Sequence, residues 1–236
     1  MPTPRHPNKP TVVAIISQKG GSGKTTLALH LAVAARQDGQ AVLIVDLDPQ
    51  ASATHWRRAR VDQSLVVQPT HPAGLDDLLR VAGEQGTNWV IIDTAAQTET
   101  AAAEAVEVAD LVLVTCRPSV MDLRAIPNSI RLCRIREKVP HVVLTQIEPQ
   151  GTLADEARTT LAGMGVLVLA GGLGRRAAYH HSLIDGRTAT ETEPKGKAAQ
   201  EVRELYGRIK ALVGKPTSRR SNKKASQLAD NGGTVS

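Results

Sequence analysis

With 236 residues, 41% of them hydrophobic, the chain is long enough for one large domain, yet no apolar run approaches the roughly 20 residues that span a bilayer. Aromatic residues make up 2% and phenylalanine is absent, which argues against stacking platforms for single-stranded nucleic acid. The formal net charge of +6 comes from the ends: residues 1–10 carry two basic residues, and residues 215–236 carry five against one acid, so residues 11–214 are close to neutral.

Apolar runs alternate with helical segments between these ends. The predicted strands are continuous apolar runs, typical of a parallel sheet covered on both faces, at 12–16, 41–45, 65–67, 89–92, 111–114, 142–144 and 166–169. The predicted helices are 25–37, 51–60, 75–84, 100–108, 120–138, 153–164 and 195–213. This order predicts an α/β fold, a mostly parallel twisted sheet with helices on both faces, which binds ligands at the carboxyl ends of its strands.

We expect three parts: a short N-terminal extension at 1–10, one folded domain at 11–214, and a basic tail at 215–236. The composition of the tail is typical of disorder, and the tail is either solubilising or an electrostatic arm for DNA. The extension lacks the apolar segment of a signal peptide, which predicts a cytoplasmic location. Cys116 and Cys133 show no metal-ligand spacing, which argues against an iron–sulfur site and fits buried thiols.

A glycine-rich segment, Lys-Gly-Gly-Ser-Gly-Lys-Thr-Thr, directly follows the first predicted strand and precedes the first predicted helix. In this context the backbone N–H groups turn toward one anion at a helix N-terminus. Lys24 is placed to reach terminal phosphates, and Thr25 to offer its hydroxyl to Mg²⁺. The segment predicts the phosphate-binding loop of a P-loop NTPase, with Lys19, Gly20, Gly21, Ser22, Gly23, Lys24, Thr25 and Thr26 binding the nucleotide.

Carboxylates close two of the predicted strands. The second strand ends in Asp46-Leu47-Asp48-Pro49-Gln50, and the fourth ends in Asp93-Thr94. Charged groups at the ends of apolar strands need partners, and a Mg²⁺ bound through water between Thr25 and two aspartates would supply one. Each motif alone is weak, since an aspartate before a proline is a common turn residue. Together, and in this order after the loop, they predict a Mg²⁺–nucleotide site.

The loop resembles the deviant Walker A loop of the ParA/MinD ATPases, which reads KGGxGKT and has a signature lysine at the position of Lys19. Gln18 stands where the usual P-loop has its first glycine. The resemblance covers roughly residues 11–212. It also rests on Asp48-Pro49-Gln50, the run 109–114 leading to Pro118-Ser119, Gly186 and the closing helix. It is closest to small plasmid-type ParA proteins without an N-terminal helix-turn-helix domain, because only ten residues precede the first strand.

The resemblance implies a homodimer that encloses two ATP molecules, with Lys19 neutralising phosphate charge on the partner's nucleotide. Lys19, Lys24 and Asp48 are then the catalytic residues, and Thr25, Asp48 and Asp93 the metal site. Asp48 would lie near Mg²⁺ and the attacking water, Asp93 would hold a Mg²⁺-bound water, and Asp46 would support them. We expect slow ATP hydrolysis that a partner accelerates, which suits a timer or switch.

Three functions remain open. The first is a nucleoid-associated DNA segregation ATPase for a plasmid or chromosome, whose ATP dimer coats nonspecific DNA and is reset by a centromere-binding, ParB-like partner. The second is a positioning ATPase for a protein complex or conjugation machinery, and the third a small-molecule ATP-dependent ligase or kinase. The C-terminal end lacks an apolar helix face, which argues against membrane targeting. The predicted DNA contacts are Arg203, Arg208 and Lys210 of the last helix, preceded by Arg175, Arg176 and Arg187.

The chain departs from the family pattern at two places. Ala95-Ala96 stand where the family often has a pair of prolines, so the timing of hydrolysis is open. Thr145 stands where many relatives have an asparagine that reads adenine, so the preference for ATP rests on the resemblance alone. Two other groups have simpler interpretations: His180-His181 as a surface pair, and Trp56 as a side chain packed against the sheet edge.

Overall fold

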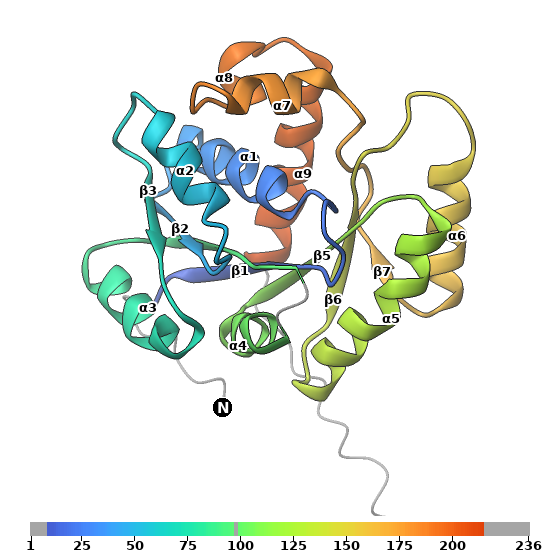
Figure 1. Cartoon of the computed structure of the whole chain (residues 1–236), viewed down its shortest axis with the longest axis horizontal. Coiled ribbons are helices and arrows are strands. Elements are labelled where there is room, and N and C mark those ends of the chain that lie inside the picture. The colour runs from blue at the N-terminus through green and yellow to red at the C-terminus, as the bar shows by residue number, and fades with distance from the viewer. Residues whose placement is uncertain (1–8, 97–98, 215–236) are drawn as a thin grey trace, which may run out of the picture.

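The computed structural model describes residues 9–96 and 99–214, so the predicted tail and most of the N-terminal extension lie outside the described residues. Seven strands form one sheet in the order β3-β2-β4-β1-β5-β6-β7, and all neighbouring strands are parallel (Figure 1). The strands are β1 (Thr11–Ile16), β2 (Val42–Asp46), β3 (Val66–Pro69), β4 (Trp89–Asp93), β5 (Leu111–Cys116), β6 (Pro140–Leu144) and β7 (Leu167–Val168). The predicted α/β fold is confirmed.

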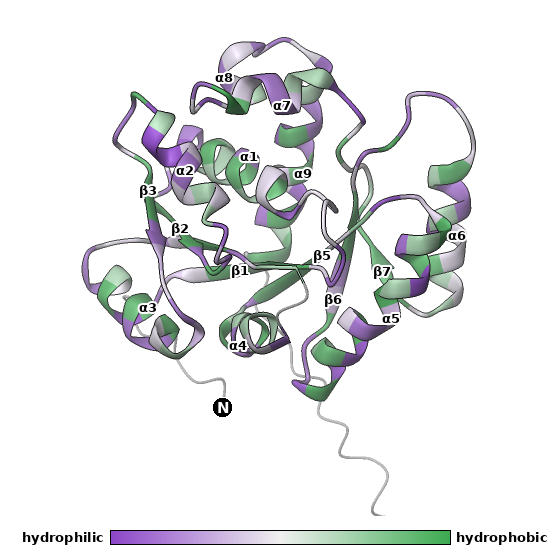
Figure 2. Cartoon of the chain, viewed as in Figure 1, coloured by the Kyte–Doolittle hydropathy of each residue, from purple (hydrophilic) through white to green (hydrophobic). Residues whose placement is uncertain are grey.

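Helices cover both faces of the sheet because its strands are apolar on both sides. Within β1, Val13 and Ile15 face one core, and Val12, Ala14 and Ile16 face the other. Figure 2 shows hydrophobic residues along the central strands and a mixture of hydrophobic and hydrophilic residues along the surrounding helices. The first core is closed by α1 (Lys24–Gln37), α2 (Ser52–Ala59), α7 (Ala177–Leu183), α8 (Ala189–Thr192) and α9 (Lys197–Val213). The second is closed by α3 (Leu75–Glu84), α4 (Glu99–Val108), α5 (Val120–Ile135) and α6 (Leu153–Gly163).

Every predicted element is found within three residues of its expected ends. The predicted helix 120–138 stops at Ile135, and Glu137 then takes a left-handed φ of 54° that no α-helix can contain. The predicted last strand, 166–169, shrinks to two residues. The short helices α7 and α8 and a single 3₁₀ turn (Pro72–Gly74) were not predicted, because each is too short to show a helical period.

The carboxyl ends of the central strands converge at one edge of the sheet. The glycine-rich loop follows β1, which lies between β4 and β5. Asp46 at the end of β2 and Asp93 at the end of β4 are direct neighbours in the strand register. The fold therefore brings the loop and both carboxylate motifs to the same edge, as the parallel topology requires. Within the described residues, no helix combines the length and apolar character needed to cross a bilayer.

Candidate nucleotide-binding site

The loop between β1 and α1 has a backbone suited to binding an anion. Gly21 and Gly23 have φ values of 68° and 87°, in the left-handed region that favours glycine, and Gly23 is the residue that caps α1. No side chain hydrogen-bonds to that end of α1. The helix N-terminus, with its partial positive charge, is therefore available to a phosphate group.

Two neighbouring strands hold this loop in place. The Ser22 and Thr115 hydroxyl oxygens lie 2.8 Å apart, and the Thr145 hydroxyl donates to the Ser22 carbonyl at 2.7 Å. The Gln146 amide donates to the Gly21 carbonyl at 2.8 Å. Thr145 therefore uses its hydroxyl to support the loop, which gives a physical role to the residue that stands in place of the family's asparagine.

Two charged side chains are buried where the predicted Mg²⁺ would bind, near the end of β4. We call this the metal side of the loop. Lys24 is 6% exposed, and its ammonium donates to the Lys19 carbonyl at 3.4 Å. Burial lowers the pKa of Lys24, while the carboxylates of Asp93 and Asp48 oppose that shift. Asp93 is fully buried, and neither of its carboxylate oxygens has a hydrogen-bond partner. Burial raises the pKa of Asp93 to about 7; the nearby Thr25 hydroxyl and the charge of Lys24 oppose this shift, and the charge of Asp46 adds to it.

The two aspartates at the end of β2 and directly after it, Asp46 and Asp48, have different surroundings. The buried Asp46 accepts hydrogen bonds from the Asp48 N–H at 3.2 Å, and from the N–H and hydroxyl of Thr54 at 2.9 and 2.8 Å. It thereby ties the end of β2 to the first turn of α2. Asp48 is only partly buried and accepts from the Gln50 N–H at 2.9 Å. Asp48 is the more accessible carboxylate of the two.

The residues at this edge fit a Mg²⁺ ion that arrives with a nucleotide. The two unpartnered oxygens of Asp93 are what a cation, or water bound to it, would satisfy. Within the described parts of the chain, no three His, Cys, Asp or Glu side chains are grouped to hold a metal by themselves. Such an ion would therefore depend on phosphate oxygens, the Thr25 hydroxyl, and Asp48 and Asp93, which matches the preference of Mg²⁺ for few protein ligands.

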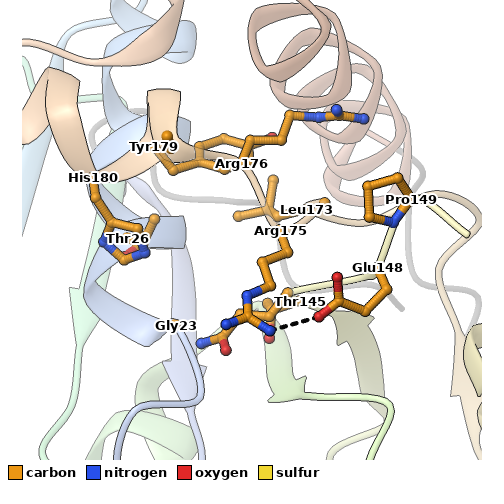
Figure 3. A pocket seen from close by; sticks show the side chains of 13 residues that line it. Gly23, Thr26, Thr145, Glu148, Pro149, Leu173, Arg175, Arg176, Tyr179 and His180 are labelled. Atoms are coloured by element: carbon orange, nitrogen blue, oxygen red, sulfur yellow. Dashed lines mark hydrogen bonds and ion pairs between the residues drawn. The ribbon is translucent and has the colours of Figure 1, made fainter.

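A cavity of about 560 Å³ opens on the other side of the loop. It runs from Gly23 and Thr26 to the loops that follow β6 and β7, and Figure 3 shows Arg175 pointing into it. In the sheet, β6 and β7 lie on the opposite side of β1 from β4 and Asp93. A nucleotide whose terminal phosphates faced Asp93 would therefore place its nucleoside toward this cavity, which we call the nucleoside-side cavity.

The six cations that the sequence suggests for DNA contact differ in their partners. Arg203 on α9 is exposed and forms no ion pair among the described residues. The other five lie near carboxylates, Lys210 with Asp38, Arg208 with Glu204, Arg175 with Glu148, Arg176 with Glu201 and Arg187 with Asp185. Arg175 also lines the nucleoside-side cavity, a place that its grouping with the DNA contacts did not anticipate.

A buried histidine that the sequence did not single out links the loop to the C-terminal half. His30, the seventh residue of α1, donates from Nδ1 to the Thr26 carbonyl at 2.8 Å, and its Nε2 accepts from the Ala189 N–H at 3.2 Å. The Tyr179 ring packs edge-on against it at 5.0 Å. Burial lowers the pKa of His30 to about 4, so it is neutral at physiological pH. No sequence pattern marks it, because its partners are far away along the chain.

The remaining predicted side chains lie where expected. Trp56 is buried where α2 packs on the edge strand β3, and its indole N–H donates to the Arg187 carbonyl at 3.1 Å. His180 and His181 are both exposed. Cys116 and Cys133 are buried free thiols.

Comparison with known proteins places this site in a family. The model of the CobQ/CobB/MinD/ParA nucleotide binding domain matches residues 13–189. "Maintenance of carboxysome distribution protein A" of Gloeobacter kilaueensis is 32% identical over 206 residues, covering 85% of this chain and 92% of that protein. "Protein ParA" of Rhizobium radiobacter is 29% identical over 155 residues, covering 58% of this chain and 65% of that protein.

Among solved structures, the septum site-determining protein MinD of Pyrococcus horikoshii, complexed with Mg-ADP, has a TM-score of 0.72 at 18% identity. The alignment covers 86% of this chain and 97% of that one. The MinD likeness shows the fold. On the family model and the Gloeobacter relative, the chain belongs to the CobQ/CobB/MinD/ParA family of nucleotide-binding ATPase domains.

Proposed function

We propose that this protein is a Mg²⁺–ATP-dependent positioning ATPase, which cycles between an ATP-bound dimer and a released form to distribute a large protein assembly. The carrying observation is the loop itself, where the ammonium of the buried Lys24 contacts the carbonyl of the half-buried Lys19 and lies near the buried carboxylate of Asp93. The cargo class is supported by the Gloeobacter relative, whose name refers to carboxysome distribution and which aligns over 92% of its length.

The residues at the carboxyl edge of the sheet have different roles in phosphoryl transfer. This reaction needs positioning and positive charge more than covalent chemistry. Lys24 neutralises the terminal phosphates in its own protomer. Lys19, which forms no ion pair within the described residues, does so across the dimer. Asp48 orients the attacking water, and its closeness to the metal makes it a poor proton acceptor, so basal hydrolysis is slow and a partner protein accelerates it. Bound Mg²⁺ supplies further charge against the phosphates.

Binding and dimerisation of three proteins test this function: the wild type, Lys24→Ala and Lys19→Ala. With ATP and Mg²⁺ we expect the wild type to bind nucleotide and dimerise, and Lys24→Ala to lose nucleotide binding. Lys19→Ala keeps ATP binding in the monomer but does not dimerise. A small-molecule ligase or kinase would instead keep its oligomeric state when Lys19 is removed.

DNA segregation is a second candidate, favoured by the similarity to Protein ParA of Rhizobium radiobacter and by the exposed Arg203 on α9. In both functions, nonspecific DNA serves as the surface on which the dimer assembles, and contacts with its phosphates weaken with salt. Binding to nonspecific duplex DNA at fixed moderate salt, with ATP–Mg²⁺ against ADP–Mg²⁺, tests this step. Binding with ATP alone supports a DNA-bound switch, and no binding with either nucleotide contradicts it. A ParB-like or cargo-linked partner would then reset the dimer.

A further inference from the structure

The nucleoside-side cavity contains one pair of charged side chains whose role the phosphate loop does not explain. Arg175 and Glu148 form an ion pair at 2.6 Å, and Figure 3 shows both side chains meeting within the cavity. They come from different loops, Glu148 after β6 and Arg175 after β7. Neither loop carries the metal-side residues, so this pair belongs to the nucleoside end of the site.

The backbone fixes where these two side chains start. Ile147 and Gly174 form a parallel bridge that extends the pairing of β6 and β7 beyond the strands, and the Arg175 N–H donates to the Ile147 carbonyl at 2.7 Å. The loop after β7 packs closely against the end of β6 at Gly172, where a Cβ would lie 2.3 Å from the Leu144 carbonyl oxygen. Both Cα positions are therefore set before any ligand binds.

Most other polar groups around the cavity are already engaged. The Thr145 hydroxyl and the Gln146 amide N–H support the phosphate loop. The Tyr179 hydroxyl donates to Glu201, and Arg176 makes two hydrogen bonds to the same carboxylate. Arg175 and Glu148, by contrast, are 71% and 44% exposed and are held by a single exposed ion pair, which a ligand opens at little cost.

We propose that Arg175 and Glu148 read the nucleobase, an inference that rests on the proposed use of ATP. The planar Arg175 guanidinium covers the face of the purine ring. Aromatic side chains often make this contact, and arginine takes their place in this chain, which has no phenylalanine. The Glu148 carboxylate, which only accepts hydrogen bonds, accepts one from the exocyclic amino group of adenine. Guanine presents a carbonyl oxygen at that position, which the carboxylate repels.

Competition binding of ATP, GTP and CTP, each with Mg²⁺, tests this assignment in the full-length protein. Glu148→Gln keeps the size of the side chain but can donate as well as accept, so we expect the preference for ATP over GTP to fall by about fivefold or more. Arg175→Ala is expected to weaken both purine nucleotides by about threefold to tenfold, and CTP less, because a pyrimidine offers a smaller ring face. Arg80→Ala and Glu84→Gln, which remove a similarly exposed ion pair on α3, serve as controls.

The possible outcomes separate the claims. An equal loss of ATP, GTP and CTP affinity in Arg175→Ala indicates a phosphate contact and overturns the stacking role. An unchanged ATP-to-GTP ratio in Glu148→Gln overturns the reading of the amino group. If the wild type does not bind ATP at all, the proposed function fails. If it binds ATP and both variants keep wild-type dissociation constants, only the base-reading inference fails.

Discussion

Asp93 is a fully buried carboxylate, and the cost of burying its charge is only partly offset by the nearby Thr25 hydroxyl and Lys24 ammonium. We predict that Asp93→Asn raises the free energy of unfolding of the nucleotide-free protein by about 1–3 kcal/mol, because an amide is less costly to bury than a charge. The same variant loses the gain in ATP affinity that Mg²⁺ gives the wild type. Urea unfolding and nucleotide titration with and without Mg²⁺ measure the two effects.

The exposed Asp76 on α3 provides a matched control. Asp76→Asn is expected to change the free energy of unfolding by less than about 0.5 kcal/mol. A destabilised Asp93→Asn protein that still responds to Mg²⁺ would mean that Asp93 serves the fold and not the metal.

His30 makes stability depend on pH. Its pKa is about 4 when folded against an ordinary value of 6.5, so the unfolded chain binds more protons between these limits. The contribution of His30 is thus fully present above pH 6.5 and is lost as the pH falls toward 4, by up to about 3 kcal/mol. Tyr179, Glu191 and His180 surround the ring; of these, Glu191 opposes the shift and His180 adds to it.

Urea unfolding of the wild type and His30→Gln at several pH values between 4 and 7 tests this. We expect the variant to lose less stability than the wild type over this range, and His181→Gln, which alters an exposed histidine, to follow the wild type. Equal slopes for the wild type and His30→Gln would contradict a buried neutral His30.

Local motifs explain what the sequence revealed at this scale. The loop at 19–26 is contiguous and has its strand and helix on either side, so its shape was predictable from the chain alone. Asp48 and Asp93 were predictable because parallel strands end at one edge. His30, by contrast, owes its role to a hydrogen bond from Ala189, 159 positions away, and Glu148 meets Arg175 only because the loops after β6 and β7 run side by side. No local pattern encodes such pairs.

At the scale of elements, Arg60, directly after α2, connects this helix to α8 and to the segment between α7 and α8. The buried Arg60 donates to the Gly186 carbonyl at 2.9 Å and pairs with Glu191 at 2.6 Å. Gly186 has a φ of 73°, and a Cβ there would lie 2.3 Å from the backbone nitrogen of Arg60. We predict that Gly186→Ala destabilises the fold by about 2–4 kcal/mol, since both the backbone conformation and the space are unavailable to alanine.

A substitution at Gly39 separates the effect of backbone conformation from the effect of missing space. It also has a positive φ, 82°, but nothing lies near its missing Cβ. Gly39→Ala should therefore cost only about 1 kcal/mol in the same thermal or urea unfolding measurement. If both variants lose the same stability, the close packing of α2 against this segment is not what Gly186 serves.

The exposed side of α9 gives a second prediction at this scale. Lys210 pairs with Asp38 at 2.5 Å, whereas Arg203 forms no ion pair among the described residues. Arg203→Ala should therefore weaken ATP-dependent binding to nonspecific duplex DNA more than Lys210→Ala, and reduce the salt dependence by about one phosphate contact. Fluorescence anisotropy at several salt concentrations measures both. A larger loss in Lys210→Ala would place the DNA contact elsewhere on α9.

The length of each helix or strand decided whether it could be predicted from the sequence. The seven strands of the described residues contain continuous apolar runs, and the seven longer helices carry enough apolar residues to show a helical period, so the predictions found them. The helices α7 and α8 have seven and four residues, and side chains from both pack against the α1 side of the core. Tertiary contacts such as the bond between His30 and Ala189, and not local propensity, explain their positions.

Across the whole molecule, the proposed nucleotide site extends along one edge of the sheet on both sides of β1. Asp93 and Asp48 lie on the metal side, and the cavity with Arg175 lies on the other. A hydrogen bond links that cavity to α9. The hydroxyl of Tyr179, which lines the cavity, donates to Glu201 of α9 at 2.7 Å. The nucleotide site is thus in contact with the helix that carries Arg203. The sequence predicted the edge and the family, but not this connection.

The central claim is that ATP joins two copies of this chain through Lys19. Sedimentation of the wild type and Lys19→Ala with ATP–Mg²⁺ and with ADP–Mg²⁺ tests it most directly, after a titration has shown that both proteins bind ATP. The account predicts a dimer for the wild type with ATP, and monomers for the wild type with ADP and for Lys19→Ala with either nucleotide. A Lys19→Ala dimer that forms with ATP as readily as the wild-type dimer would contradict it.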